Sequence, residues 1–471
     1  MRYFTGLRLC ILLVFSLLAL SGISQTVIKG EVSKGQEKPM MLILKPIAKE
    51  AVSDQEAVIE ELYKLFEFDL SFSGAFRVTT ENAPAAYLKK QDEIAGTVDF
   101  KEWERLKVDN RPVVYLVKTY LVPRGAGLYE LDVLVYDIAQ GVRKIGTAYG
   151  ADPHPAFNRK LLRTAGHQAT ADIIQTLSDI EPITQTRLAF VNYNKTKRTK
   201  EIHLIDYDGW KESLTQLTYF NSVTIQPDWS PDGKKLSYVS FKDSQAADCF
   251  IQEVATGKVT PFAHFVGTNQ TPRWYPSGKQ LALSLSAEGN FEVYRMGLDE
   301  KKPKRLTFNP AIDEGPDVSP TGNQIAFISD RIGSPKVYVM DQDGTNQRRI
   351  VFLDRKCDTP MWSPVPVQYQ TESESDYRIA FCGFYSSLQS DIFTVRPDGS
   401  DPRMLTDEKG DNQHPSWSPN GQYIAFASTR TGKSEIYIMS SDPDRLLPNG
   451  ERFYRVTYVG GENLSPSWSP N

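Results

Sequence analysis

The sequence predicts a fold of two parts: an α/β N-terminal domain, and an all-β, six-bladed β-propeller closed by pairing of the C-terminal strand with the N-terminal blade. Three observations support this. A short motif returns six times in the second half, each copy is followed by runs of alternating apolar and polar residues, and a mixed helix and strand pattern precedes the first copy. The expected divisions are a signal peptide at 1–24, a mobile segment at 25–40, the α/β domain at 41–183 and the propeller at 184–471.

The motif in its fullest form is Pro-Asp-Trp-Ser-Pro-Asp-Gly. Its copies begin at Pro227, Pro272, Pro316, Pro360, Pro415 and Pro466, at spacings of 45, 44, 44, 55 and 51 residues. Repeats of this length built from short strands are typical of propeller blades. Proline and glycine shape a tight turn, and tryptophan offers a large apolar face for packing between blades. The motif is therefore interpreted as structural rather than as a ligand site.

Strand-like runs follow each copy, for example Leu236–Val239 and Ile325–Ile328, and Asp-Gly pairs suited to tight hairpins separate later runs. A set of three strands without a preceding motif stands first, at Arg187–Val191, Glu201–Ile205 and Gln216–Thr218. The last motif copy has no strands after it. Because a closed ring avoids an open sheet edge, the C-terminal strand is expected to complete the first blade.

The segment before the propeller predicts a compact α/β domain. Ser53 and Glu56 have the spacing of a capping box, and Val58, Leu62, Leu65 and Phe66 lie on one face of the helix that follows. The remaining expected elements are strands at Met41–Leu44 and Phe76–Val78, a helix at Lys101–Leu106, a meander of Val113–Leu121, Tyr129–Ile138 and Val142–Gly150, and a long helix at Ala156–Leu177.

The start of the chain has the pattern of a secretory signal peptide. Arg2 and Arg8 precede the apolar run Leu9–Leu20, and small residues lead to an expected cleavage near Ser24. No other segment is long and apolar enough to span a bilayer, so an exported protein that does not span the membrane is expected. Of the cysteines that remain, Cys249, Cys357 and Cys382, all are interpreted as buried thiols, with a Cys357–Cys382 disulfide left open.

Composition and motifs argue against several functions. The chain has 54 Lys and Arg against 58 Asp and Glu, with no basic stripe that would indicate a nucleic-acid partner. A hydrolase would need a Gly-x-Ser-x-Gly nucleophile elbow, and the sequence has none. The five histidines, His154, His167, His203, His264 and His414, lack metal-ligand spacing and are interpreted as isolated side chains. No catalytic residue, cofactor or metal is therefore expected.

On these residues the chain resembles the TolB family of the Tol-Pal system. The resemblance rests on Phe72–Val78, on Tyr129–Asp137, on the six blades and on the terminal Trp468-Ser469-Pro470. It implies a monomeric periplasmic binding protein that is not an enzyme. It implies a TolA-like inner-membrane partner and a Pal-like, peptidoglycan-associated outer-membrane lipoprotein as a second partner. The implied role is in outer-membrane integrity and in envelope invagination during cell division.

The resemblance also implies where partners dock. The loop before each motif strand opens at the funnel mouth, where a Pal-like lipoprotein is expected to contact Thr268, Asn269, Gln270, Asp313, Glu314, Asp358, Asn412, His414, Glu462 and Asn463. Thr26, Val27 and Ile28 match the family segment expected to contact a TolA-like protein. Two alternatives stay open: a secreted propeller that binds a glycan or small ligand in its funnel, and a degenerate prolyl-oligopeptidase-type propeller without its hydrolase domain.

Overall fold

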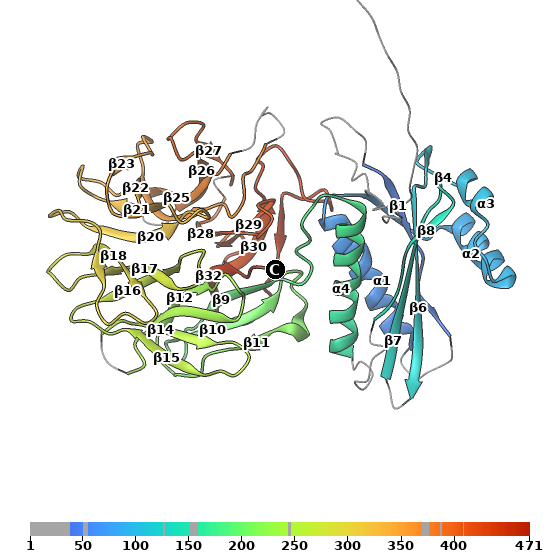
Figure 1. Cartoon of the computed structure of the whole chain (residues 1–471), viewed down its shortest axis with the longest axis horizontal. Coiled ribbons are helices and arrows are strands. Elements are labelled where there is room, and N and C mark those ends of the chain that lie inside the picture. Colours follow the sequence, from blue (N-terminus) through green and yellow to red (C-terminus); the bar gives the residue numbers. More distant parts are fainter. Residues whose placement is uncertain are drawn as a thin grey trace, which may run out of the picture.

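The computed structural model describes residues 38–49, 55–125, 128–149, 159–243, 246–369, 376–386, 389–407 and 409–471. The expected signal peptide, its cleavage site and the segment holding Thr26, Val27 and Ile28 lie outside these residues. The described chain forms an α/β domain beside a propeller, with two helices of the domain lying between its sheet and the ring (Figure 1). Within these ranges, no helix combines the length and apolar character needed to cross a membrane.

The α/β domain is a mixed sheet with helices on both faces. The sheet order is β3-β1-β6-β7-β8, with β2 paired to β6, and β1 runs parallel to both of its neighbours. Its elements are β1 (Met40–Ile43), β2 (Ile47–Ala48), α1 (Gln55–Phe72), β3 (Arg77–Thr80), α2 (Ala83–Ala95), α3 (Phe100–Arg105), β4 (Lys107–Val108), β5 (Arg111–Pro112), β6 (Tyr115–Gly125), β7 (Leu128–Asp137), β8 (Val142–Tyr149) and α4 (Arg159–Leu177).

Two apolar cores hold these layers together. On one face of the sheet, α1 and α4 pack through Leu62, Leu65 and Phe66, as the helical pattern predicted. On the other face, α2 and α3 cover the sheet around the fully buried Trp103. Helix α2 was not anticipated. Asn82 caps it by accepting a hydrogen bond from the Ala85 N–H at 2.9 Å, which satisfies one free donor of the first turn.

The propeller has six sheets of four antiparallel strands, as predicted. The first blade holds β9 (Arg187–Asn194), β10 (Thr199–Asp206), β11 (Thr215–Gln216) and β32 (Glu462–Trp468), with a short 3-10 helix, η1, at Lys211–Ser213. The other blades are β12 (Thr224–Trp229) to β15 (Val259–Ala263), β16 (Asn269–Trp274) to β19 (Lys304–Arg305), β20 (Asp313–Val318) to β23 (Arg348–Arg349), β24 (Lys356–Trp362) to β27 (Arg403–Met404), and β28 (Asn412–Trp417) to β31 (Phe453–Arg455). The middle strands of these five blades are β13 (Lys235–Ser240), β14 (Asp248–Glu253), β17 (Gln280–Leu285), β18 (Glu292–Gly297), β21 (Gln324–Ser329), β22 (Lys336–Asp341), β25 (Ile379–Ser386), β26 (Gln389–Val395), β29 (Tyr423–Ser428) and β30 (Glu435–Ser440).

The ring closes through its last strand. β32 pairs antiparallel with β9, so the first blade has the order β11-β10-β9-β32, and the expected closure is confirmed. The motif tryptophans tie neighbouring blades together. The Trp468 indole packs in the core shared by the sixth and first blades, and its N–H donates to Thr186 Oγ1, just before β9, at 2.8 Å. The Trp229 indole N–H, in the second blade, donates to the Ser467 carbonyl of the first blade at 3.1 Å. These contacts agree with the structural interpretation of the motif.

The six motif strands begin on one face of the ring, the mouth face, and end on the opposite face, the base face. The α/β domain contacts the base face. The Phe72 ring of α1 stacks on Tyr423 at a centroid distance of 4.4 Å and lies 5.7 Å from the ring of Tyr207. The Asn420 amide, in a motif turn, donates to the Glu181 carbonyl at 3.0 Å. Among the described residues, these domain contacts leave the mouth face open.

Two further features concern the cysteines and the irregular turn of the fourth motif copy. Cys249, Cys357 and Cys382 are all buried and free, so the disulfide that the sequence left open is not formed. The turn of the fourth copy is replaced by a longer connection in which Val367 and Asp376 form an isolated bridge. Residues 370–375 of that connection lie outside the described part of the chain.

Candidate functional site

Each motif strand carries a β-bulge at the same place. The pairing register shifts just before the motif proline in all six blades. The residue at that position has a positive φ: Gln226 (55°), Thr271 (50°), Gly315 (60°), Thr359 (49°), His414 (55°) and Ser465 (45°). Five of these six are not glycine, although this backbone region costs a non-glycine residue of order 1 kcal/mol. Bulges turn side chains away from the regular pleat, and here they direct polar groups to the ring centre.

The bulge residues surround one central cavity of about 220 Å³. Because all six motif strands contribute to its wall, they are the innermost strands of their blades. Four of the predicted partner-binding residues lie in the same wall: Gln270, Glu314, Asp358 and His414. The structure therefore brings together side chains that are up to 144 residues apart in the sequence, from Gln270 to His414.

The cavity wall is polar, and burial shifts the pKa of at least two of its side chains. The Gln270 amide donates to Glu314 Oε2 at 3.0 Å. Burial, and then the nearby Asp358 carboxylate, raise the pKa of Glu314 above its ordinary value. Burial, and then the positive charge of Arg273, lower the pKa of His414 to about 4, so its imidazole is neutral at neutral pH. Its Nδ1 has no hydrogen-bond partner within the described chain.

Below this wall, acidic side chains anchor the motif strands. Asp228 pairs with Arg273 at 3.0 Å and accepts a hydrogen bond from the Trp274 N–H at 3.0 Å. Asp317 accepts from the Trp362 N–H at 2.7 Å, and burial raises its pKa to about 7. These aspartates bind the backbone of the next blade, so they hold the ring together beneath the cavity.

Four predicted partner-binding residues have another role in the structure. Asn269, Asp313, Asn412 and Asn463 have fully buried side chains. The amides of the three asparagines donate to acidic side chains of the preceding blade: Asn269 to Asp248 at 3.2 Å, Asn412 to Asp391 at 2.9 Å and Asn463 to Glu435 at 2.7 Å. Asp313 is paired with Arg331 at 2.9 Å within its own blade. In this conformation these four side chains are inside the ring and out of reach of a partner.

The last two predicted residues, Thr268 and Glu462, lie half-buried at the edge of the mouth and outside the cavity wall. The Thr268 N–H donates to Ser286 Oγ at 2.8 Å. Glu462 forms an ion pair with the exposed Lys195 at 2.6 Å. Thr268 belongs to one of the loops that join an outer strand to the next motif strand, and Glu462 is the first residue of motif strand β32.

The same loops carry exposed apolar side chains that the sequence analysis did not identify. We call them the rim set: Tyr219, Val266, Phe308, Phe352 and Tyr458, whose residues are 66–86% exposed. Arginine side chains lie over three of the rings: Arg305 over Phe308 at 4.8 Å, Arg349 over Phe352 at 4.3 Å and Arg455 over Tyr458 at 4.3 Å. Three of the four aromatic members follow a Leu-Thr or Val-Thr pair whose threonine is buried, and this repeated position is a signal that the sequence does contain.

The mouth face thus combines a polar, partly desolvated centre with an apolar and basic edge. This composition differs from that of an ordinary solvated surface, because aromatic and arginine side chains are the residues enriched where proteins bind one another. The arrangement suits a protein ligand whose tip enters the cavity while its flanks lie on the rim set.

Known proteins share both parts of this architecture. A family model described as "TolB amino-terminal domain" matches residues 29–143, and one described as "TolB beta propeller domain" matches residues 174–382. The "Tol-Pal system protein TolB" of Francisella tularensis is 27% identical over 404 residues, which cover 82% of this chain and 84% of that protein. The protein of the same name from Desulfosudis oleivorans is 30% identical over 226 residues, 47% of this chain and 48% of its own length.

The solved structure of TolB from Acinetobacter baumannii matches over 93% of this chain and 98% of that chain, with 25% identity and a TM-score of 0.71. The match extends over both the α/β domain and the six blades. The chain therefore belongs to the TolB family of Tol-Pal system proteins.

Proposed function

We propose that this protein is a periplasmic binding component that captures a Pal-like, peptidoglycan-associated lipoprotein at the mouth face of its propeller. The observation that carries the proposal is the joining of the central cavity and the rim set on the one propeller face that the α/β domain leaves free. A binding role, rather than catalysis, fits a surface of this kind. Direct contacts are assigned to Gln270, Glu314, Asp358 and His414, and to the rim set.

The family supports the wider role. The related proteins from Francisella and Desulfosudis are named as Tol-Pal system proteins. We propose that this chain likewise links inner-membrane Tol proteins to the outer-membrane lipoprotein, and so serves outer-membrane integrity and envelope invagination during division. Contact with a TolA-like protein is assigned to the segment with Thr26, Val27 and Ile28, after cleavage of the signal peptide near Ser24.

The buried asparagines refine the binding hypothesis. Asn269, Asn412 and Asn463 hold neighbouring blades together, so we propose that they act by fixing the shape of the mouth. Changing one of them should alter partner binding through a loss of ring stability. Changing Glu314 or Phe308 should alter binding while the ring stays as stable as before, because these side chains face the cavity and the solvent.

The test is titration calorimetry of the purified protein with the soluble domain of a Pal-like lipoprotein. Glu314→Lys places a positive charge in the cavity, and Phe308→Ala removes one member of the rim set. Each is expected to weaken binding at least tenfold, because a charged or aromatic side chain that the partner fully desolvates is worth about 2 kcal/mol or more. The matched controls are Asp299→Lys, at an exposed acidic residue on the base face, and Ile94→Ala, at an exposed apolar residue of α2.

Both controls should bind as tightly as the unchanged protein. If the two mouth variants also bind normally, the proposed site is wrong. If the lipoprotein is not bound at all and a sugar or other small ligand occupies the cavity instead, the function as a protein-binding component is wrong.

A further inference from the structure

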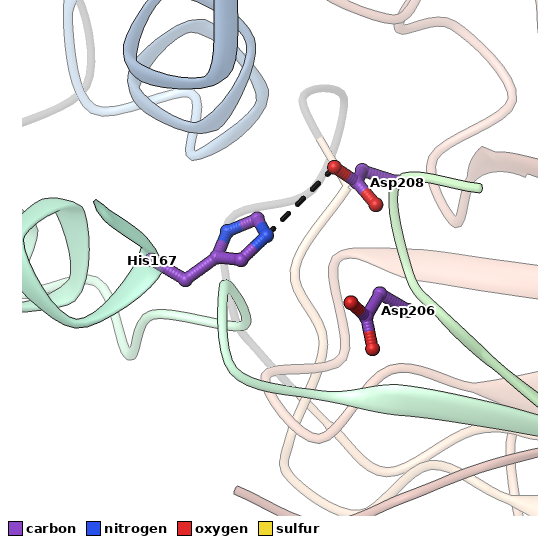
Figure 2. A group of neighbouring side chains, drawn as sticks. All are labelled: His167, Asp206 and Asp208. Carbon is purple, nitrogen blue, oxygen red and sulfur yellow. Dashed lines mark ion pairs between the residues drawn. The ribbon is translucent and has the colours of Figure 1, made fainter. Parts of the chain in front are cut away.

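A second group of polar side chains lies away from the mouth, at the junction between the α/β domain and the base face. His167 belongs to α4, Asp206 ends β10, and Asp208 follows in the turn. One potential ligand atom from each lies within 4.8 Å of those from the other two. Figure 2 shows the imidazole of His167 facing the two carboxylates across the domain junction. From the sequence, His167 was interpreted as an isolated side chain; docking of the α/β domain on the base face gives it these neighbours.

The tautomer of His167 is set by a third carboxylate. His167 Nδ1 lies 2.7 Å from Asp69 Oδ2, and Asp69 also accepts hydrogen bonds from Thr170 at 2.6 Å and Tyr207 at 2.6 Å. With Nδ1–H donating to Asp69, a neutral imidazole has its lone pair on Nε2. The same carboxylate–histidine pairing orients histidine ligands in metalloproteins.

The Nε2 atom of His167 is buried and has no hydrogen-bond partner in the described chain, and the residue is only 5% exposed. It points at Asp208 Oδ2, 3.8 Å away, which is the ion-pair distance drawn in Figure 2. An unpaired polar atom in a buried site is destabilising, because it has lost its hydrogen bonds to water and has formed none within the protein. A cation between Nε2 and the carboxylates would satisfy it.

The charge balance of the junction also favours a cation. Arg163 pairs with Glu61 and Asp208, and Arg187 pairs with Asp206. The fourth carboxylate of the junction, Asp69, contacts His167 and no guanidinium group in these pairs. The four carboxylates outnumber the two guanidinium groups, which leaves an excess of negative charge in a largely buried place. Buried charges are stable when they are paired or bound to a metal ion.

We propose that His167, Asp206 and Asp208 bind a divalent transition-metal ion, with zinc as the best match, that fastens α4 to the first blade. One imidazole and two carboxylates suit zinc, whereas calcium and magnesium take oxygen ligands. Donor atoms around a tetrahedral zinc ion, about 2.0–2.1 Å from it, lie roughly 3.4 Å apart. The present separations of up to 4.8 Å therefore need to close by up to about 1.4 Å. A water molecule would fill the fourth position.

One side chain must move for the ion to bind. The Arg163 guanidinium contacts the Asp208 oxygen that faces His167. Arg163 has a second acidic neighbour, Glu61, at 3.8 Å, and lies over the Trp210 ring at 4.7 Å. It can therefore turn toward Glu61 while its stacking on Trp210 is kept. Because His167 comes from one domain and the aspartates from the other, the ion would bind only while the domains are docked.

The experiment is a titration of the whole purified chain with zinc alone, after removal of metal by a chelator and dialysis. We expect one equivalent bound with a Kd in the micromolar range or tighter. Asp206→Asn and His167→Gln should each weaken binding at least tenfold. The matched control is His264→Gln, because His264 also pairs with a carboxylate, Asp248 at 2.7 Å, but is well exposed and outside the cluster.

A spectroscopic reading separates ligation from a merely structural role. In protein with ¹⁵N-labelled histidine, zinc should shift the Nε2 resonance of one buried histidine, and this shift should be absent in His167→Gln. Asp206→Asn leaves the His167–Asp69 contact in place and removes only a partly exposed ion pair with Arg187 at 3.6 Å. Its melting temperature with chelator should therefore stay close to that of the unchanged protein. Failure of the unchanged chain to bind zinc, unaltered affinity in Asp206→Asn, or an equal loss in His264→Gln would each overturn the proposal.

Discussion

Replacing Trp468 by alanine tests whether the seam of the ring is as strong as the other blade junctions. Trp468 is 6% exposed, packs in the core shared by the first and sixth blades, and donates its indole N–H to Thr186. Truncating a buried aromatic side chain costs about 3–5 kcal/mol, and the lost hydrogen bond adds about 1 kcal/mol. The sum, about 4–6 kcal/mol, is a large part of the 5–15 kcal/mol that typically stabilises a folded protein.

Thermal unfolding followed by circular dichroism gives the reading. With roughly 2–4 °C per kcal/mol for a domain of this size, Trp468→Ala should melt about 10–20 °C lower. Trp417→Ala should show a similar loss, because Trp417 fills the equivalent place between the fifth and sixth blades and donates to the Met361 carbonyl at 3.0 Å. Tyr458→Ala, at an exposed ring, should change stability by less than about 0.5 kcal/mol.

Comparing the melting temperatures of Trp468→Ala and Trp417→Ala shows whether β32 stabilises the ring as much as another motif strand does. If Trp417→Ala destabilises the protein and Trp468→Ala leaves its melting temperature unchanged, β32 contributes nothing to the ring. Removal of residues 463–471 would then also be harmless, and the idea of a closed disc would be wrong.

Three further predictions concern charge, thiols and domain docking. Burial raises the pKa of Asp317 from 3.8 to about 7, so the folded protein keeps a proton that the unfolded chain releases. The free energy of unfolding should therefore fall as pH rises from about 4 to 7, by up to about 4 kcal/mol, and Asp317→Asn should flatten this slope in urea titrations. The thiols of Cys249, Cys357 and Cys382 are buried and free, and burial raises the pKa of Cys357 to about 11. A thiol reagent should label none of them in the folded protein and all three in denaturant. Phe72→Ala removes a buried ring from the domain junction at a cost of about 3–5 kcal/mol, and should make the link between the domains more sensitive to protease.

Each of these three predictions has a control variant or condition and a result that would contradict it. Asp343→Asn, at an exposed turn, should leave the pH slope intact; an unchanged slope in Asp317→Asn would contradict the assigned titration. A change in melting temperature on adding a reductant would indicate a disulfide. Tyr87→Ala, at an exposed ring of α2, should not alter proteolysis, and equal sensitivity in both variants would argue against docking through Phe72.

The repeat allowed most of the fold to be predicted from the sequence. A motif that returns at nearly constant spacing specifies both the number of blades and the strand left over for closure. Helix α2 was missed because its only buried residues are Ala85 and Asp92, so it shows little apolar periodicity. Asp92 is instead held by the buried Lys118 at 2.8 Å, a contact between distant parts of the chain that no local pattern reveals.

The sequence could place the candidate residues near the starts of the motif strands, but it could not show which of their side chains face the central cavity. Asn269 and Gln270 are adjacent in the sequence, yet alternation along the strand puts one inside the ring and the other in the cavity wall. Polar character alone does not separate the two. The cluster around His167 could not be predicted from the sequence either. His167 and Asp206 are 39 positions apart, and their contact depends on how the two domains dock.

Hydrogen exchange on the complex with a Pal-like lipoprotein tests the central claim most directly, since it reports every loop of the ring at once. We predict that protection from exchange gathers in the loops that carry the rim set and in the first residues of the motif strands that follow them, including Gln270 and Glu314. Base-face loops, such as that of Asp299, should exchange as in the free protein. Protection confined to the base face or to the α/β domain would contradict the assignment of the mouth face as the binding surface.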